Sequence, residues 1–129
     1  MKNINLNSDI GEGFGVYDIG NDTEMLKIVN SANIACGFHA GDPNVMDRVV
    51  KQSIKNGVSI GAHPGFNDLW GFGRRQIHMS TDEIEASVAY QIGALQAISA
   101  TNNAIVTHVK PHGALNNMSS LDPDIAAAI

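Results

Sequence analysis

The chain has 129 residues, of which 43% are hydrophobic and 16% charged, a composition typical of a globular domain with a sizeable core. The formal net charge is −5, and the eight Lys and Arg residues are scattered, which argues against an electrostatic nucleic-acid binder. No apolar run approaches the roughly 20 residues of a membrane span, the N-terminal residues lack the apolar core of a signal peptide, and the single cysteine cannot form an internal disulfide. We therefore expect a cytoplasmic protein.

Short apolar segments alternate with helical patterns along the chain. In chain order we expect strands at 3–9, 31–37, 58–64 and 104–111, and helices at 22–30, 42–57, 80–103 and from 122 onward. The second helix has the clearest signals, because Asp42 can cap it, Pro43 can start it and Gly57 can end it. The third helix begins with Ser80 and Glu83, which fit a capping box.

Strands that alternate with crossover helices predict an α/β fold with a parallel sheet. Four parallel strands alone would leave two open edges, and the segment after Pro123 stops on apolar residues without a C-cap. We therefore expect residues 1–129 to be a single α/β barrel domain that is C-terminally truncated, or a domain completed by another chain.

Polar residues follow the predicted strands at the ends where parallel α/β folds build their active sites. These residues are Asp9, Glu12, His39, Asp42, His63, His108, Lys110 and His112. Such residues can act as general acids and bases, and Asp9, His39 and His63 could instead hold zinc or manganese with a position left open for water. Two alternatives stay open: metal-free acid–base chemistry, and a chance gathering of polar residues in loops.

For several other residues the sequence indicates only a structural role or a weak binding signal. Cys36 ends an apolar strand, so we expect it to pack in the core, and His78 is expected at the surface. Arg74 and Arg75 follow two glycines and could clamp a carboxylate or phosphate, although a solvated arginine pair is equally compatible with the sequence. The stretch "GEGFG" is followed by no P-loop lysine, so it is a weak nucleotide-binding signal.

Five stretches of the chain resemble, in order and spacing, the LamB/YcsF family from near residue 4 to the C-terminus. They are "LNSDIGEGFG", "SANIACGFHAGDP", "GAHPGFNDLWGFGRR", "YQIGALQA" and "HVKPHGALNNM". Members of that family are about twice as long, which implies that this chain is an N-terminal half. The family fold resembles the distorted (β/α) barrel of glycoside hydrolases and polysaccharide deacetylases.

The resemblance implies an ATP-dependent 5-oxoprolinase, in which 5-oxo-L-proline, ATP and water give L-glutamate, ADP and phosphate, and in which subunits B and C are partners. It assigns catalysis to Asp9, Glu12, His39, Lys110 and His112, with His63 beside them, and substrate binding to Asp42, Arg74 and Arg75. Because no P-loop lysine is present, we expect the ATP site wholly or partly on a partner. The family usually has cysteine at Ser8 and tyrosine at Asn116. The first departure argues against an indispensable thiol beside Asp9, and the second is expected to alter a contact in the substrate pocket.

Opening a five-membered lactam requires an activated carbonyl, a placed water and a proton for the leaving nitrogen. We expect Asp9 or His39 to position the water and His112 to donate the proton. Lys110 and the arginine pair would neutralise a carboxylate or phosphoryl group. Two other functions remain open: a metal-dependent deacetylase-like or sugar-processing hydrolase, by fold analogy alone, and a non-catalytic binding or regulatory subunit. Homo-oligomerisation also stays open.

Overall fold

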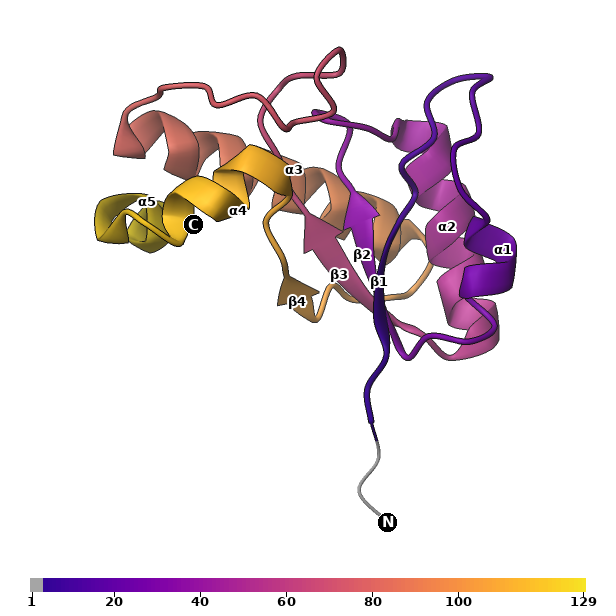
Figure 1. Ribbon diagram of the computed structural model, residues 1–129. Coiled ribbons are helices and arrows are strands. Elements are labelled where there is room, and N and C mark those ends of the chain that lie inside the picture. Colours follow the sequence, from indigo (N-terminus) through magenta and orange to yellow (C-terminus); the bar gives the residue numbers. More distant parts are fainter. Residues whose placement is uncertain (1–3) are drawn as a thin grey trace.

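The computed structural model describes residues 4–129 and contains a four-stranded parallel sheet flanked by helices (Figure 1). Its elements in chain order are β1 (Asn7–Ile10), α1 (Asp22–Met25), β2 (Ser31–Ala35), α2 (Pro43–Asn56), β3 (Ser59–His63), α3 (Thr81–Thr101), β4 (His108–Val109), α4 (Gly113–Ser119) and α5 (Pro123–Ala128). The strands lie in the order β1-β2-β3-β4, and every neighbouring pair is parallel. This arrangement confirms the predicted α/β class.

The two faces of the sheet differ in chemistry because side chains alternate along each strand. One face carries Ile10, Ile34 and Ala62, and it packs against α2 and α3 in the main hydrophobic core. The opposite face has Asp9 on β1, Asn33 on β2, Gly61 on β3 and His108 on β4 at one level of the register. Polar side chains thus come from three strands, and the His108 ring covers Gly61 of the fourth.

The best-defined helices begin and end where the sequence indicates. The Asp42 side chain accepts hydrogen bonds from two backbone N–H groups at the start of α2, and Gly57 ends that helix in a left-handed conformation (φ +68°). Ser80 and Glu83 form the predicted capping box of α3. The predicted surface position of His78 and the buried position of Cys36 are also confirmed.

Other boundaries differ from the prediction. β1 starts at residue 7, although the prediction began at residue 3, which lies outside the described residues. α1 has only four residues, and β4 has only two. α4 was not predicted at all. Within residues 4–129, none of the helices has the length and apolar character needed to cross a membrane.

Leu95→Ala is expected to lower the free energy of unfolding by about 2–5 kcal/mol, because Leu95 of α3 is completely buried in the main core. The matched control is Leu121→Ala, which removes a side chain that is 88% exposed and should change stability by less than about 0.5 kcal/mol. Urea unfolding followed by circular dichroism measures both. Equal losses for the two variants would contradict the packing of α3 on the sheet.

Candidate functional site

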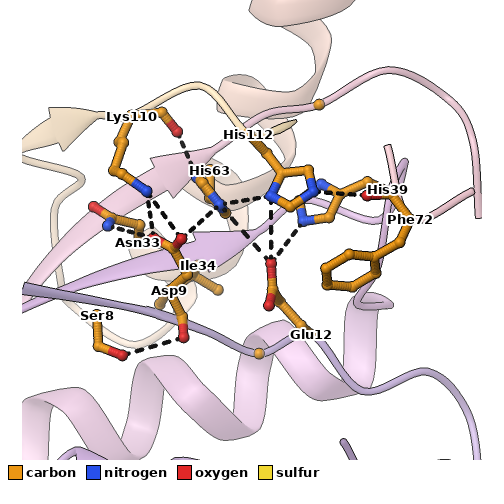
Figure 2. A network of polar contacts seen from close by, with 12 residues as sticks. Ser8, Asp9, Glu12, Asn33, Ile34, His39, His63, Phe72, Lys110 and His112 are labelled. Carbon is orange, nitrogen blue, oxygen red and sulfur yellow. Dashed lines mark hydrogen bonds and ion pairs between the residues drawn. The ribbon is translucent and has the colours of Figure 1, made fainter. Parts of the chain in front are cut away.

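Six of the predicted polar residues meet at the carboxyl ends of the strands, and Figure 2 shows them in one network. They are Asp9, Glu12, His39, His63, Lys110 and His112. Each comes from the end of a strand or from the loop that follows it, as the parallel topology requires. The structure therefore brings together every residue expected to be catalytic.

Asp9 is the centre of one half of this network. Lys110 Nζ donates to both Asp9 carboxylate oxygens, at 2.8 and 2.9 Å, and Asn33 Nδ2 donates to Asp9 Oδ1 at 2.8 Å (Figure 2). Partial burial opposes ionisation of Asp9, but its contacts with His63, Lys110 and Asn33 outweigh it and hold its pKa well below the usual range. Asp9 is thus a fixed anion paired with an ammonium group.

Asn33 is a buried member of the network that the sequence interpretation missed. Its Oδ1 accepts hydrogen bonds from Asn7 Nδ2 and His108 Nε2, both at 3.1 Å, so it links β1 to β4. The His108 ring lies directly over Gly61, where a Cβ atom would stand only 2.2 Å from His108 Nε2. Period-two alternation in β2, which puts Asn33 on the same face as Asp9, is the sequence signal that could have identified it.

Three buried histidines form the other half of the network. His63 Nδ1 donates to the backbone oxygen of Lys110 at 2.5 Å, and His112 Nε2 donates to the backbone oxygen of Phe72 at 2.7 Å. His39 stacks parallel on His112 with 3.7 Å between ring centroids, and its Nε2 lies 3.1 Å from Glu12 Oε1. Backbone carbonyls only accept hydrogen bonds, so they fix which nitrogen of His63 and of His112 carries a proton.

Burial keeps the stacked rings of His39 and His112 neutral. It lowers the pKa of His112 to about 4, with a further contribution from the neighbouring His39, and it lowers the pKa of His39 against the opposing pull of Glu12. A neutral ring that already donates its N–H to a backbone carbonyl offers only a lone pair. In this state His112 can accept a proton or bind a cation through Nδ1, and the proton-donating role expected from the sequence requires that it first take up a proton.

The set Glu12, His39, His63 and His112 could hold a metal ion, since one donor atom from each lies within 4.8 Å of the others. Asp9, which the sequence suggested as a ligand with His39 and His63, lies beside this set. Its Oδ2 is 3.4 Å from His63 Nε2, but both of its oxygens also accept hydrogen bonds from Lys110.

Two of the three residues expected to bind substrate already have their polar side-chain atoms bound by other groups of the chain. Asp42 Oδ1 caps α2, and its Oδ2 accepts a hydrogen bond from Gly15 N at 2.8 Å, which fastens the loop after β1. Arg75 forms an ion pair with the buried carboxylate of Asp68. Arg74 is exposed, and its guanidinium lies over the Phe72 ring, 5.3 Å from the centroid. Of the two arginines, Arg74 alone has no carboxylate partner among the described residues.

Neither departure from the family pattern alters the network. Ser8 alternates with Asp9 along β1, so the two side chains lie on opposite faces of the sheet, and its Oγ donates to the backbone oxygen of Asp9. Asn116 lies on α4 with an exposed side chain.

Asp68→Asn is expected to remove a contribution to stability that depends on pH. Hydrogen bonds from Arg75 lower the pKa of Asp68 from its usual 3.8 to about 2. The ion pair therefore stabilises the folded protein above pH 4, and its contribution disappears as the pH falls from about 4 to 2. In urea unfolding, the gap between wild type and the variant should be constant from pH 7 to 5 and should shrink below pH 4. Arg75→Gln should follow the same profile, and a gap that does not vary with pH would contradict this assignment.

An apolar cavity of about 200 Å³ lies beside the histidines. Glu12 and His39 contribute its polar wall, and the remaining lining side chains are almost all apolar: Phe14, Tyr17, Ile19, Ala40, Leu69 and Phe72. They come mainly from the loop after β1 and the loop after β3, which rise on the same side of the sheet in Figure 1. The volume is below that of pockets for drug-sized ligands, so the cavity suits a small molecule with an apolar part.

Comparisons with known proteins identify the family of this chain. The model of the LamB/YcsF family matches residues 4–129. A protein of Natranaerobius thermophilus, named as the A subunit of 5-oxoprolinase, is 58% identical over 129 residues, which is all of this chain and 50% of that protein. A protein of the same name from Staphylococcus carnosus is 58% identical over 126 residues, covering 98% of this chain and 50% of its own length.

A solved structure has the same fold. The crystal structure of a lactam utilization protein from Thermus thermophilus superimposes with a TM-score of 0.97 at 46% identity, covering 99% of this chain and 52% of that one. The chain thus spans about half the length of the relatives it matches.

Proposed function

The chain belongs to the LamB/YcsF family, and from this premise we propose that it is the N-terminal half of the A subunit of an ATP-dependent 5-oxoprolinase. In this proposal residues 1–129 form the first half of a distorted (β/α) barrel, and the whole enzyme opens 5-oxo-L-proline to L-glutamate. The observation that carries the proposal is the Asp9–Lys110 pair and histidine cluster beside a small apolar cavity. Relatives that bear the name of this 5-oxoprolinase component and match the entire chain support it.

The cavity fits the chemistry of a lactam acid. Its apolar walls can contact the ring methylenes, and Arg74, whose guanidinium lies over the Phe72 ring that lines the cavity, is available for the substrate carboxylate. Lys110, held by Asp9, can stabilise the negative charge that develops on the lactam oxygen or on a phosphoryl group attached to it. The histidine cluster and Glu12 can accept a proton from the attacking water. Asp9 remains the residue that we propose to position this water.

ATP enters the proposal as a co-substrate. The lactam is a stable amide, and transfer of the γ-phosphoryl group to its oxygen would make the ring carbon electrophilic. Attack by one water, with cleavage of the C–N bond and transfer of a proton to the nitrogen, then leaves an acyl phosphate. A second water hydrolyses this to glutamate and phosphate, while ADP is the other product. Because "GEGFG" is not followed by a P-loop lysine, we place the ATP site at least partly on a partner, for which subunits B and C are the expected chains.

The test is reconstitution of the full-length protein with its partner subunits, followed by measurement of glutamate and ADP release from 5-oxoproline and ATP. We expect the two products in equal amounts, and little or no turnover when any subunit or ATP is omitted. An assembled complex that releases no glutamate would refute the proposal.

The second candidate function is a metal-dependent hydrolase of the deacetylase type, which the convergence of Glu12 with three histidines favours. This activity would need neither ATP nor partners. Release of acetate from acetylated sugars by the metal-loaded, full-length protein alone would support it. Absence of such release, together with glutamate formation by the complex, would eliminate it.

A further inference from the structure

Two histidine lone pairs face each other at the centre of the site. His63 gives its Nδ1–H to the Lys110 carbonyl, and His112 gives its Nε2–H to the Phe72 carbonyl (Figure 2). The remaining nitrogens, His63 Nε2 and His112 Nδ1, carry no proton when the rings are neutral, yet they lie only 3.0 Å apart. Both rings are at least 95% buried. Two lone pairs at this distance repel each other unless a cation lies between them.

A carboxylate completes the set of donors. Glu12 Oε1 lies 3.6 Å from His112 Nδ1 and 3.8 Å from His63 Nε2. His39 Nε2 is 3.1 Å from the same oxygen, so its N–H can hold Glu12 in this position. Asp9 is the other nearby carboxylate, but both of its oxygens are bound by Lys110. Glu12 is therefore the anionic group free to join the two histidines.

The three donor atoms match the edges of a small metal polyhedron. Zinc in tetrahedral coordination binds nitrogen and oxygen at about 2.0–2.2 Å, which places neighbouring ligand atoms about 3.4 Å apart. The observed separations of 3.0, 3.6 and 3.8 Å bracket that value. We propose that Glu12 Oε1, His63 Nε2 and His112 Nδ1 bind one divalent transition-metal ion, best matched by zinc, with the fourth position open.

The surroundings have the form of a second coordination shell. Both histidines donate their outer N–H to a backbone carbonyl, the arrangement that orients metal-bound imidazoles. His39 is then a positioning residue for Glu12. The proposed ligands therefore differ from the Asp9, His39 and His63 set suggested by the sequence. Since Glu12 also lines the apolar cavity, a ligand in the cavity could reach the open position. The site is argued from donor atoms alone and does not depend on the proposed oxoprolinase activity.

The test measures metal binding by the full-length protein without any activity assay. The protein is stripped with a chelator, dialysed against zinc and examined by elemental analysis, where we expect about one ion per chain. Cobalt(II) substitution should give the intense visible absorption of a four-coordinate site. Glu12→Gln, His63→Gln and His112→Gln should each weaken zinc binding at least about 100-fold, whereas His39→Gln should cost about 10–100-fold, as loss of a positioning residue does.

His78→Gln is the matched control, because His78 is exposed and outside the cluster. It should bind zinc like the wild type, and circular dichroism shows whether each variant is folded. The cobalt spectrum of the wild type needs no variant, so a poorly folding substitution does not remove the test. A folded wild type that takes up no zinc or cobalt would overturn the proposal. So would metal binding that is unchanged in folded His63 and His112 variants, or an NMR signal for a proton shared between these rings that persists in excess zinc.

Discussion

Asp9→Asn is expected to lower glutamate formation by the assembled complex at least about 100-fold without unfolding the protein. The substitution keeps the shape of the side chain but removes the negative charge to which Lys110 donates two hydrogen bonds. Lys110 would lose its fixed position, and the proposed water would lose its anionic partner. The rate of glutamate release at saturating 5-oxoproline and ATP measures the effect, and thermal melting shows that the fold is retained.

Two further variants make this result specific. Lys110→Met should reduce turnover by a similar factor, and the double variant should lose little more than either single one, because residues that act as a unit are not additive. Asp82→Asn is the matched control, since Asp82 is an exposed aspartate in the first turn of α3. The proposed roles of Asp9 and Lys110 would be refuted if Asp9→Asn kept a turnover within a few-fold of wild type. They would also be refuted if the losses of turnover in the two single variants were fully additive in the double variant.

The sequence predicts best those elements whose signals are local. The two longest helices of the described chain, α2 and α3, carry their own capping side chains, so their limits follow from a few adjacent residues. The polar residues at the strand ends are likewise predictable, because parallel topology brings all carboxyl ends to one edge. Strand–helix alternation predicts the α/β class, and the strand-end rule predicts six members of the network but not Asn33.

Elements that depend on distant contacts were predicted poorly. β4 pairs with β3 only through Gly61↔His108 and Ala62↔Val109, so most of the apolar segment from 104 to 111 is not in a ladder. α4 begins directly after His112, where a backbone N–H at Ala114 bonds to the carbonyl of Gly73 from another loop. Neither the length of a strand ladder nor a hydrogen bond between distant loops produces a periodic pattern in the sequence.

The chemical roles of single residues were the hardest to predict. Asp42 and Arg75 have the residue types of substrate ligands, but their polar atoms are used by Gly15 and Asp68. The state of His112 depends on burial and on the carbonyl of Phe72, which no motif encodes. Sequence spacing thus indicated which residues gather, and only the three-dimensional hydrogen bonds indicated which atoms remain available for substrate or metal.

Gly73→Ala is expected to lower the free energy of unfolding by about 2–6 kcal/mol and to abolish most of the activity. Gly73 has φ +64°, and an added Cβ would stand 2.7 Å from His39 Cβ and 2.9 Å from His112 Cδ2. Left-handed strain and overpacking each cost about 1–3 kcal/mol. The loop would have to move, and with it the Phe72 carbonyl that orients His112. Urea unfolding and glutamate release measure the two effects.

Gly93→Ala is the matched control with the opposite sign. Gly93 lies within α3, and an added Cβ there would meet no atom within 4 Å. Alanine is the better helix former, so this variant should be more stable than wild type by about 0.5–1 kcal/mol and fully active. A Gly73→Ala protein with the unfolding free energy and the glutamate-release rate of the wild type would contradict the close contact of this loop with His39 and His112. It would also contradict the role of the Phe72 carbonyl in orienting the His112 ring.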